Sequence, residues 1–248
     1  MGEPADGVLL IHAFPMDASM WDEQVTSLRD RWSVTAPSLP GFGGTPDVGE
    51  TMTMGAAADR CLQAADALGI ERMVVCGLSM GGYVAFELWR MARQRVAGLV
   101  LANTRSGEDA PEAAQGRRAL AERLDAEGND FLVEAPPPLL SARASEDVWA
   151  WVRSSIRGQP ARSIAAAARG MAERRDSTPD LGAIDVPVLV ITSEQDTLIP
   201  PEMTVPMAEH IPHAQLITIP DAGHLSNVEA PQAFARALDS FLEGFEHS

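Results

Sequence analysis

Met73-Val74-Val75-Cys76-Gly77-Leu78-Ser79-Met80-Gly81-Gly82 is the stretch that decides the fold of this chain. Its four apolar residues at the start are typical of a strand that is buried on both faces of a sheet. The amphipathic residues after Gly82 predict a helix. A chain that passes from strand to helix within a few residues holds Ser79 in a strained conformation and lifts its hydroxyl off the end of the sheet.

Residues 77–81, here called the serine turn, have glycine two positions before and two positions after Ser79. A Cβ atom at Gly77 or Gly81 would collide with a neighbouring segment of the backbone, so glycine is needed at both positions. A Gly-x-Ser-x-Gly match also arises by chance in about one in ten chains of this composition, where it marks an ordinary turn serine. The strand before the turn and the helix after it favour a nucleophile at Ser79.

Length and composition indicate one large α/β domain, because the chain has 248 residues, of which 46% are hydrophobic. Lys and Arg number 19 and Asp and Glu number 35, which gives a net charge of −16. Such a surface would repel nucleic acid and anionic membranes rather than bind them. The acidity is expected to serve solubility and says nothing about a substrate.

The two cysteines fall in different predicted elements, Cys61 in a helix and Cys76 in the buried strand, so inert thiols are expected rather than a disulfide. No spacing of Cys and His is typical of a metal site, so no metal is expected. The N-terminus lacks the basic and apolar regions of a signal peptide, and no apolar run approaches the roughly 20 residues of a membrane span. We therefore expect a cytoplasmic protein.

Strand patterns alternate with helical patterns, which predicts a parallel sheet covered by helices on both faces. The strands are expected at residues 8–11, 33–36, 73–76, 97–101, 186–191 and 216–219. Between residues 105 and 178 the alternation stops, and helical patterns occur with almost no strand signal. We therefore predict an α/β core of residues 1–104 and 179–248, with residues 105–178 inserted as a helical lid.

A serine hydroxyl needs a base within hydrogen-bond reach to become a nucleophile near neutral pH. His224 follows the strand at 216–219, on the edge of the sheet where Ser79 emerges, and is the expected base. His12 ends a strand in a motif with its own structural use and is the alternative. The remaining histidines are expected at the surface or in the C-terminal tail: His210, His213 and His247.

The base in turn needs an anion that fixes its tautomer and stabilises the imidazolium. Asp196 follows the strand at 186–191 and is the expected partner, with Glu194 and Asp221 as alternatives. Asp221 lies too near His224 along the chain to reach round it easily. The resulting order, Ser79, Asp196 and His224, is the acyl-transfer order of this strand–turn–helix architecture.

Five motifs together resemble those of an α/β-hydrolase, in the lid-bearing branch of 3-oxoadipate enol-lactonase-like esterases. They are His12-Ala13-Phe14-Pro15-Met16-Asp17, Leu39-Pro40-Gly41-Phe42-Gly43-Gly44, Cys76 to Gly82, Asp196 with Pro200, and Gly223-His224. The resemblance implies an α/β-hydrolase fold with a mostly parallel sheet and a helical lid. It also implies an oxyanion hole formed by the backbone N–H groups of Phe14 and Met80.

Two departures from the family pattern bear on these expectations. Ala13 stands where the family usually has glycine, which is expected to tilt the N–H of Phe14 and reduce activity. Relatives also have two further strands ahead of residue 8, so this chain is expected to have a six-stranded sheet with residues 33–36 at an edge. An uncovered edge would favour pairing between subunits, which leaves monomer and homodimer as alternatives.

The resemblance implies a serine hydrolase that cleaves small carboxylic esters or lactones without a cofactor. Carbon–carbon bond hydrolases and cofactor-free haloperoxidases of the same fold use a similar triad and remain alternatives. Dehalogenases and epoxide hydrolases have aspartate at the nucleophile position, and Ser79 argues against both. A non-catalytic ligand-binding member is the alternative from another class of protein.

The substrate pocket is expected to combine lid and core side chains. Trp149, Trp151, Leu139 and Leu140 would form an apolar wall of the lid, although packing within the lid would explain them equally well. Arg105 begins the lid and could meet a substrate carboxylate, with a solvated arginine as the alternative. The core would contribute Phe42, Leu198 and Leu225.

Overall fold

A computed structural model of the chain describes residues 5–47 and 49–245. Its sheet has six strands in the order β2-β1-β3-β4-β5-β6, and every neighbouring pair is parallel. This confirms the predicted sheet, with the strand at residues 33–35 at one edge. The strands are β1 (Gly7–Ile11), β2 (Ser33–Thr35), β3 (Met73–Leu78), β4 (Val96–Ala102), β5 (Val188–Ser193) and β6 (Gln215–Ile219).

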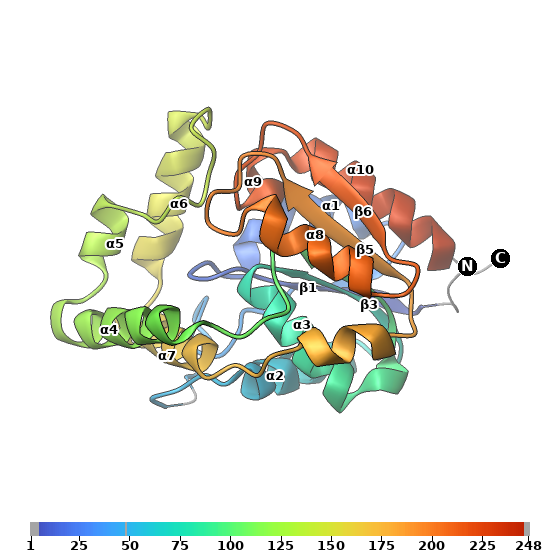
Figure 1. The fold of residues 1–248 in the computed structure, drawn as a ribbon, viewed down its shortest axis with the longest axis horizontal. Coiled ribbons are helices and arrows are strands. Elements are labelled where there is room, and N and C mark those ends of the chain that lie inside the picture. Colours follow the sequence, from blue (N-terminus) through green and yellow to red (C-terminus); the bar gives the residue numbers. More distant parts are fainter. Residues whose placement is uncertain (1–4, 48, 246–248) are drawn as a thin grey trace.

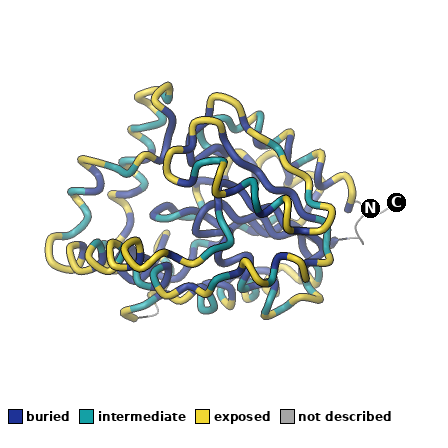
Figure 2. Tube along the Cα trace, viewed as in Figure 1, coloured by how far each residue is buried: buried dark blue, intermediate teal, exposed yellow. Residues whose placement is uncertain are grey.

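Helices cover the sheet so completely that β1, β3, β4 and β5 are buried along their whole length. Figure 2 shows these strands as a dark blue centre surrounded by partly exposed helices. The helices of this layer are α1 (Asp22–Leu28), α2 (Met54–Ala67), α3 (Met80–Met91), α8 (Pro201–His210), α9 (Ser226–Glu229) and α10 (Pro231–Leu242). Short 3-10 helices, η1 (Ala18–Trp21), η2 (Arg93–Arg95) and η4 (Glu243–Phe245), complete it.

Between β4 and β5 the chain forms four further α-helices, which lie to one side of the sheet in Figure 1. They are α4 (Pro111–Glu127), α5 (Asp130–Glu134), α6 (Glu146–Gly158) and α7 (Ala161–Ala172), followed by the 3-10 helix η3 (Thr178–Ala183). Helices α4 and α7 pack against each other over most of their length. No strand forms in this part of the described chain.

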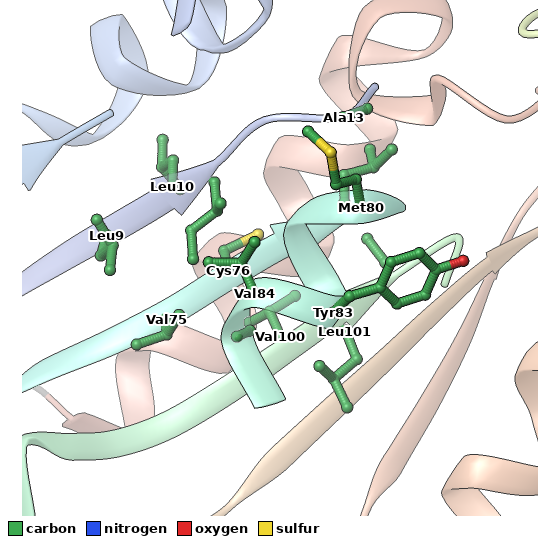
Figure 3. Packing of buried hydrophobic residues seen from close by; sticks show 14 of the residues in the cluster. Leu9, Leu10, Ala13, Val75, Cys76, Met80, Tyr83, Val84, Val100 and Leu101 are labelled. Carbon is green, nitrogen blue, oxygen red and sulfur yellow. The ribbon is translucent and has the colours of Figure 1, made fainter. Parts of the chain in front are cut away.

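The core beneath the serine turn is a continuous apolar cluster from three strands and one helix. Figure 3 shows the side chains of β1, β3 and β4 meeting those of α3. Cys61 of α2 and Cys76 of β3 are both buried and are free thiols. Burial raises the pKa of Cys61 to about 12, so this thiol stays protonated and unreactive.

The parallel topology brings several strand ends to one edge of the sheet. Gly77 of β3 pairs with Leu101 of β4, and Ala102 pairs with Ile191 of β5. Ser193 at the end of β5 pairs with Ile219 at the end of β6. Residues that follow these strands therefore lie side by side at the carboxyl edge, where open α/β sheets place their sites.

The observed elements differ from the sequence-based bounds in two places that matter. The strand expected at 186–191 runs from Val188 to Ser193, because Pro187 has no N–H with which to join the ladder. The short helix α9 was not predicted; it begins two residues after His224 and helps to fix the loop before it.

Candidate active site

Ser79 lies in the tight turn between β3 and α3, with a backbone φ of 56°. Its N–H donates to the carbonyl of Ala102 at 2.9 Å. A Cβ atom on Gly77 would lie 2.2 Å from the carbonyl oxygen of Gly81, and one on Gly81 would lie 2.1 Å from that of Ile11. Both glycines are therefore required by the close approach of backbone, and the turn holds the serine in the positive-φ region.

One hydrogen bond joins Ser79 to His224 and a second joins His224 to Asp196, the histidine and the aspartate identified from the sequence. Nε2 of His224 lies 2.7 Å from Oγ of Ser79, and Nδ1 of His224 lies 2.8 Å from Oδ2 of Asp196. The side chains of His224 and Asp196 are fully buried. The three residues follow β3, β5 and β6, so the sheet edge brings together groups that are far apart along the chain.

The carboxylate of Asp196 accepts three hydrogen bonds besides that of the imidazole. Oδ1 accepts from the backbone N–H groups of Leu198 at 3.0 Å and Ile199 at 2.9 Å. Oδ2 accepts from Nδ2 of Asn103 at 2.9 Å. These donors stabilise the anion and fix its direction, which orients the imidazole in turn.

Asn103 is a site residue that the sequence analysis missed. It follows β4 directly, and it is fully buried with a φ of 44°. Its Nδ2 also donates to Oγ of Ser193 at 2.9 Å, and its Oδ1 accepts from Oγ of Ser226 at 2.6 Å. Its place at the end of a strand between β3 and β5 is the signal that could have identified it.

The alternative anions lie outside this chain of hydrogen bonds. Asp221 is exposed and forms an ion pair with Arg143 at 2.6 Å. Glu194 is exposed and accepts from the N–H of Asp221 at 3.2 Å. Neither carboxylate contacts the imidazole of His224.

The alternative base, His12, holds the loops beneath the site. Its Nε2 accepts from the N–H of Leu39 at 2.9 Å, and its Nδ1 lies 3.0 Å from the carbonyl of Ala13. Burial lowers its pKa to about 4, so the ring is neutral near pH 7. His210 and His213 are exposed, and His247 lies outside the described residues.

The backbone N–H groups of Phe14 and Met80 are available as hydrogen-bond donors, as an oxyanion hole requires. Neither donates to an acceptor in residues 5–47 or 49–245. Met80 is the first residue of α3, where backbone N–H groups lack a partner within the helix. Phe14 lines the same cavity as Ser79.

A cavity of about 250 Å³ opens above Ser79. Its apolar wall comes from Phe14, Tyr83, Leu120, Pro137, Leu139, Met171, Leu198 and Ile199, and its charged wall from Arg105 and Arg117. Of the pocket residues expected from sequence, Arg105, Leu139 and Leu198 therefore line it. Tyr83, Leu120, Met171 and Arg117 were not anticipated, because their place depends on how α4 and α7 pack.

The five other expected pocket residues are not among those that line the cavity, and each has a packing reason. Leu140 is buried in the hydrophobic core. Phe42 is fully buried, with its ring 5.3 Å from that of His12. Leu225 is fully buried, and its N–H donates to Leu139 at 2.8 Å. Trp151 lines a separate cavity with Met20 and Val228, and Trp149 packs half-buried against the core. Helix α4, rather than α6, faces the serine.

The carboxylate of Glu229 ties the loop of His224 to the segment before α6. Oε2 of Glu229 accepts from the N–H of Gly223 at 2.8 Å and from the N–H of Ser141 at 3.0 Å. Oε1 accepts from Oγ of Ser141. The loop before the histidine is thus fixed on both sides.

Among the described residues no group of three or more His, Cys, Asp or Glu side chains could hold a metal ion. Within the same residues, every helix is too short or too polar to cross a membrane.

Comparison with known proteins agrees with this fold. A model of the Alpha/beta hydrolase family matches residues 8–237, and the chain therefore belongs to that family. It is 29% identical to 3-oxoadipate enol-lactonase 1 of Acinetobacter baylyi, over 98% of this chain and 91% of the relative. It is also 29% identical to the pimeloyl-[acyl-carrier protein] methyl ester esterase of Nitrosomonas europaea, over 94% of each.

A solved structure is more similar still. The chain superposes on a thermophilic esterase from Thermogutta terrifontis, described with malate bound, with a TM-score of 0.94 and 40% sequence identity. The match covers 100% of this chain and 93% of that esterase. The resemblance found in the sequence motifs is confirmed.

Proposed function

We propose that this protein is a carboxylic ester hydrolase that cleaves esters or lactones through an acyl-enzyme on Ser79. The observation that carries the proposal is the continuous line of hydrogen bonds from Oγ of Ser79 through His224 to Asp196, at 2.7 and 2.8 Å. The names of the relatives, two esterases and an enol-lactonase, support the same class of substrate.

In the first half of the reaction, Oγ of Ser79 attacks the substrate carbonyl while Nε2 of His224 takes its proton. Nδ1 keeps its own proton, because it faces the carboxylate of Asp196, which accepts it as a hydrogen bond. The N–H groups of Phe14 and Met80 would bind the oxyanion of the tetrahedral intermediate. Such a donor typically contributes about 3 kcal/mol to lowering the barrier.

When the tetrahedral intermediate collapses, the ester C–O bond breaks, His224 gives the proton to the leaving alcohol, and the acyl group remains on Ser79. Water then enters, and His224 takes a proton from it as its oxygen adds to the acyl carbonyl. The bond between the acyl carbon and Oγ of Ser79 breaks, His224 returns the proton to Oγ, and the acid leaves. The first proton transfer of the reaction joins two groups that already lie 2.7 Å apart, Oγ of Ser79 and Nε2 of His224.

Residues 105–178 act in this proposal as a lid over the serine. Helices α4 and α7 supply Leu120 and Met171 to the cavity wall, and residues 137 and 139 close it from the side of the histidine loop. An apolar cover that keeps bulk water from the serine strengthens the hydrogen bonds beneath it.

A panel of substrates tests this proposal: a short p-nitrophenyl ester, a lactone and a vinylogous diketone, each with the wild type and with Ser79→Ala. We expect hydrolysis of the ester or the lactone, and a loss of at least about a thousandfold in kcat for the variant. Circular dichroism should show that the variant keeps its fold. Cleavage of the diketone alone would contradict ester hydrolysis, and full activity in the variant would contradict the nucleophile.

A further inference from the structure

One buried carboxylate is shared by three arginines, two of which line the cavity above Ser79. Oδ1 of Asp109 accepts from Nη2 of Arg174 at 2.9 Å and from Nη2 of Arg105, and Oδ2 accepts from Nε of Arg117 at 2.6 Å. The side chain of Asp109 is only 1% exposed. It lies between the end of β4 and α4, and it holds all three guanidinium groups near one another.

The charges of this cluster do not cancel. Burial raises the pKa of Asp109, but its hydrogen bonds and ion pairs with Arg174 and Arg117 outweigh that effect and lower the pKa to about 2. One full negative charge therefore faces three positive charges, a surplus of two. None of the three arginines forms an ion pair with a second carboxylate in the described part of the chain.

Arg174 has a structural role, because it is buried and its guanidinium donates to backbone carbonyls as well as to Asp109. Its side chain is 3% exposed, its Nη1 donates to the carbonyl of Met171, and its Nη2 donates to that of Gly107. Its guanidinium lies 4.2 Å from the centre of the Tyr83 ring. Figure 3 shows the hydroxyl end of that ring directed away from the other labelled side chains of the core. Arg174 alone would give Asp109 a buried partner.

Arg105 and Arg117 are different, because both line the cavity that contains Ser79. Their side chains are 19% and 25% exposed. Each uses one nitrogen for Asp109, and their other nitrogens donate to no acceptor in residues 5–47 or 49–245. Two guanidinium groups thus have free donors in an otherwise apolar pocket.

Such an arrangement is selective for an anion. The chain as a whole carries a net charge of −16, so its surface does not attract anions in general. A guanidinium held in place by a buried carboxylate loses little entropy when it binds a planar carboxylate, and it binds one with two parallel hydrogen bonds.

We propose that Arg105 and Arg117 form a carboxylate-binding subsite, so that the preferred substrate is an ester or lactone with a free carboxylate. This inference rests on the proposed hydrolysis at Ser79 and specifies the substrate class of that site. The carboxylate can belong to the acyl part or to the alcohol part of the ester. Both have the chemistry that the subsite recognises.

Two pairs of substrates distinguish these sources. Monoethyl glutarate is compared with the ethyl ester of glutaric acid monoamide, in which a neutral amide replaces the acyl-side carboxylate. O-acetyl glycolate is compared with O-acetyl glycolamide, which does the same on the alcohol side. We expect kcat/KM of the acid to exceed that of its amide by at least about tenfold in one of the two pairs.

Variants connect the preference to the two arginines. In Arg105→Gln and Arg117→Gln we expect the acid-to-amide ratio to fall toward one, through a higher KM for the acid rather than a lower kcat. Arg117→Lys should restore part of the ratio, because the charge remains. The matched control is Arg118→Gln, the next residue on α4, which is exposed and should leave the ratio unchanged. Thermal unfolding checks that each variant is folded.

Binding to Ser79→Ala separates this inference from the proposed function. Calorimetry should show that monoethyl glutarate or O-acetyl glycolate binds this variant at least about tenfold more tightly than its amide, and that adding Arg117→Gln removes the difference. If no ester is hydrolysed but this binding is seen, the hydrolase proposal fails and the subsite stands. If neutral esters are hydrolysed while neither pair shows a preference, or the preference survives without both arginines, the subsite is wrong.

Discussion

Nδ2 of Asn103 lies 2.9 Å from Oδ2 of Asp196, the same oxygen that faces Nδ1 of His224 at 2.8 Å. The amide therefore restrains the carboxylate in the plane from which it orients the imidazole. It acts on the reaction through Asp196, and so it is a positioning residue.

Replacing Asn103 with alanine removes this donor and leaves the carboxylate with its two backbone donors. We expect kcat for a short p-nitrophenyl ester to fall about tenfold with KM nearly unchanged, because a hydrogen bond to a charged group contributes about 1.5 kcal/mol or more. Ser226→Ala is the control, since it removes only the group that donates to Oδ1 of Asn103. An equal loss in both variants would mean that the amide only stabilises the fold.

The contacts of Glu229 predict a second positioning effect. Glu229→Ala removes both acceptor oxygens, which leaves the N–H of Gly223 and the N–H and Oγ–H of Ser141 without this partner. We expect a loss of about 2 kcal/mol in the free energy of unfolding and a several-fold lower kcat. Urea unfolding and steady-state kinetics measure the two effects. Unchanged kcat with lowered stability would show that His224 does not depend on this tie.

Gly81 in the buried serine turn and Gly116 on the exposed surface of α4 give opposite predictions. Gly81→Ala should destabilise the protein by more than about 2 kcal/mol, because its Cβ would meet the carbonyl of Ile11. Gly116→Ala in α4 has nothing within 4 Å of the new Cβ, and it should stabilise by about 0.5 to 1 kcal/mol. Urea unfolding of both variants checks the pair. Unchanged stability in Gly81→Ala would contradict the close approach of the backbone at Gly81 to the backbone at Ile11.

The buried His12 predicts a loss of stability in mild acid. Its pKa is near 6.5 in the unfolded chain and about 4 in the folded protein, so below pH 6.5 the unfolded state takes up the proton first. Its stabilising contribution is complete above pH 6.5 and is lost as the pH falls to 4, by about 3 kcal/mol. Urea unfolding at pH 7, 5.5 and 4 measures this loss.

His12→Gln is the matched variant for this measurement. Its side chain does not titrate, so the free energy of unfolding should depend less on pH between 6.5 and 4, whatever its value at pH 7. The same slope in the variant and the wild type would show that other groups cause the acid lability.

Ser79, His224 and Asp196 could be predicted because a local sequence pattern marks each residue and all three follow strands that end at the same edge of the sheet. Gly77 and Gly81 mark the turn around Ser79, and Asp196 and His224 each follow a predicted strand. Parallel strands end at the same edge, so local patterns were enough to bring these three groups together.

The walls of the cavity had no such signal. Arg117 lies on α4 and Tyr83 on α3, and both line the pocket because of contacts between segments that are far apart in the chain. Trp149 and Trp151 were expected there as large apolar side chains of the insertion, but α6 turns them toward other surfaces. Asn103 was missed for a related reason, because the need to satisfy a buried carboxylate appears only once the fold is known.

Labelling with a fluorophosphonate tests the central claim most directly, because the reagent forms a covalent bond only with an activated serine. The folded protein is incubated with the probe, digested, and mapped by mass spectrometry, with His224→Ala and heat-denatured protein as controls. The account predicts one label per chain, on Ser79, and almost none in either control. A folded wild-type protein with no label on Ser79, or with equal labelling in His224→Ala, would contradict it.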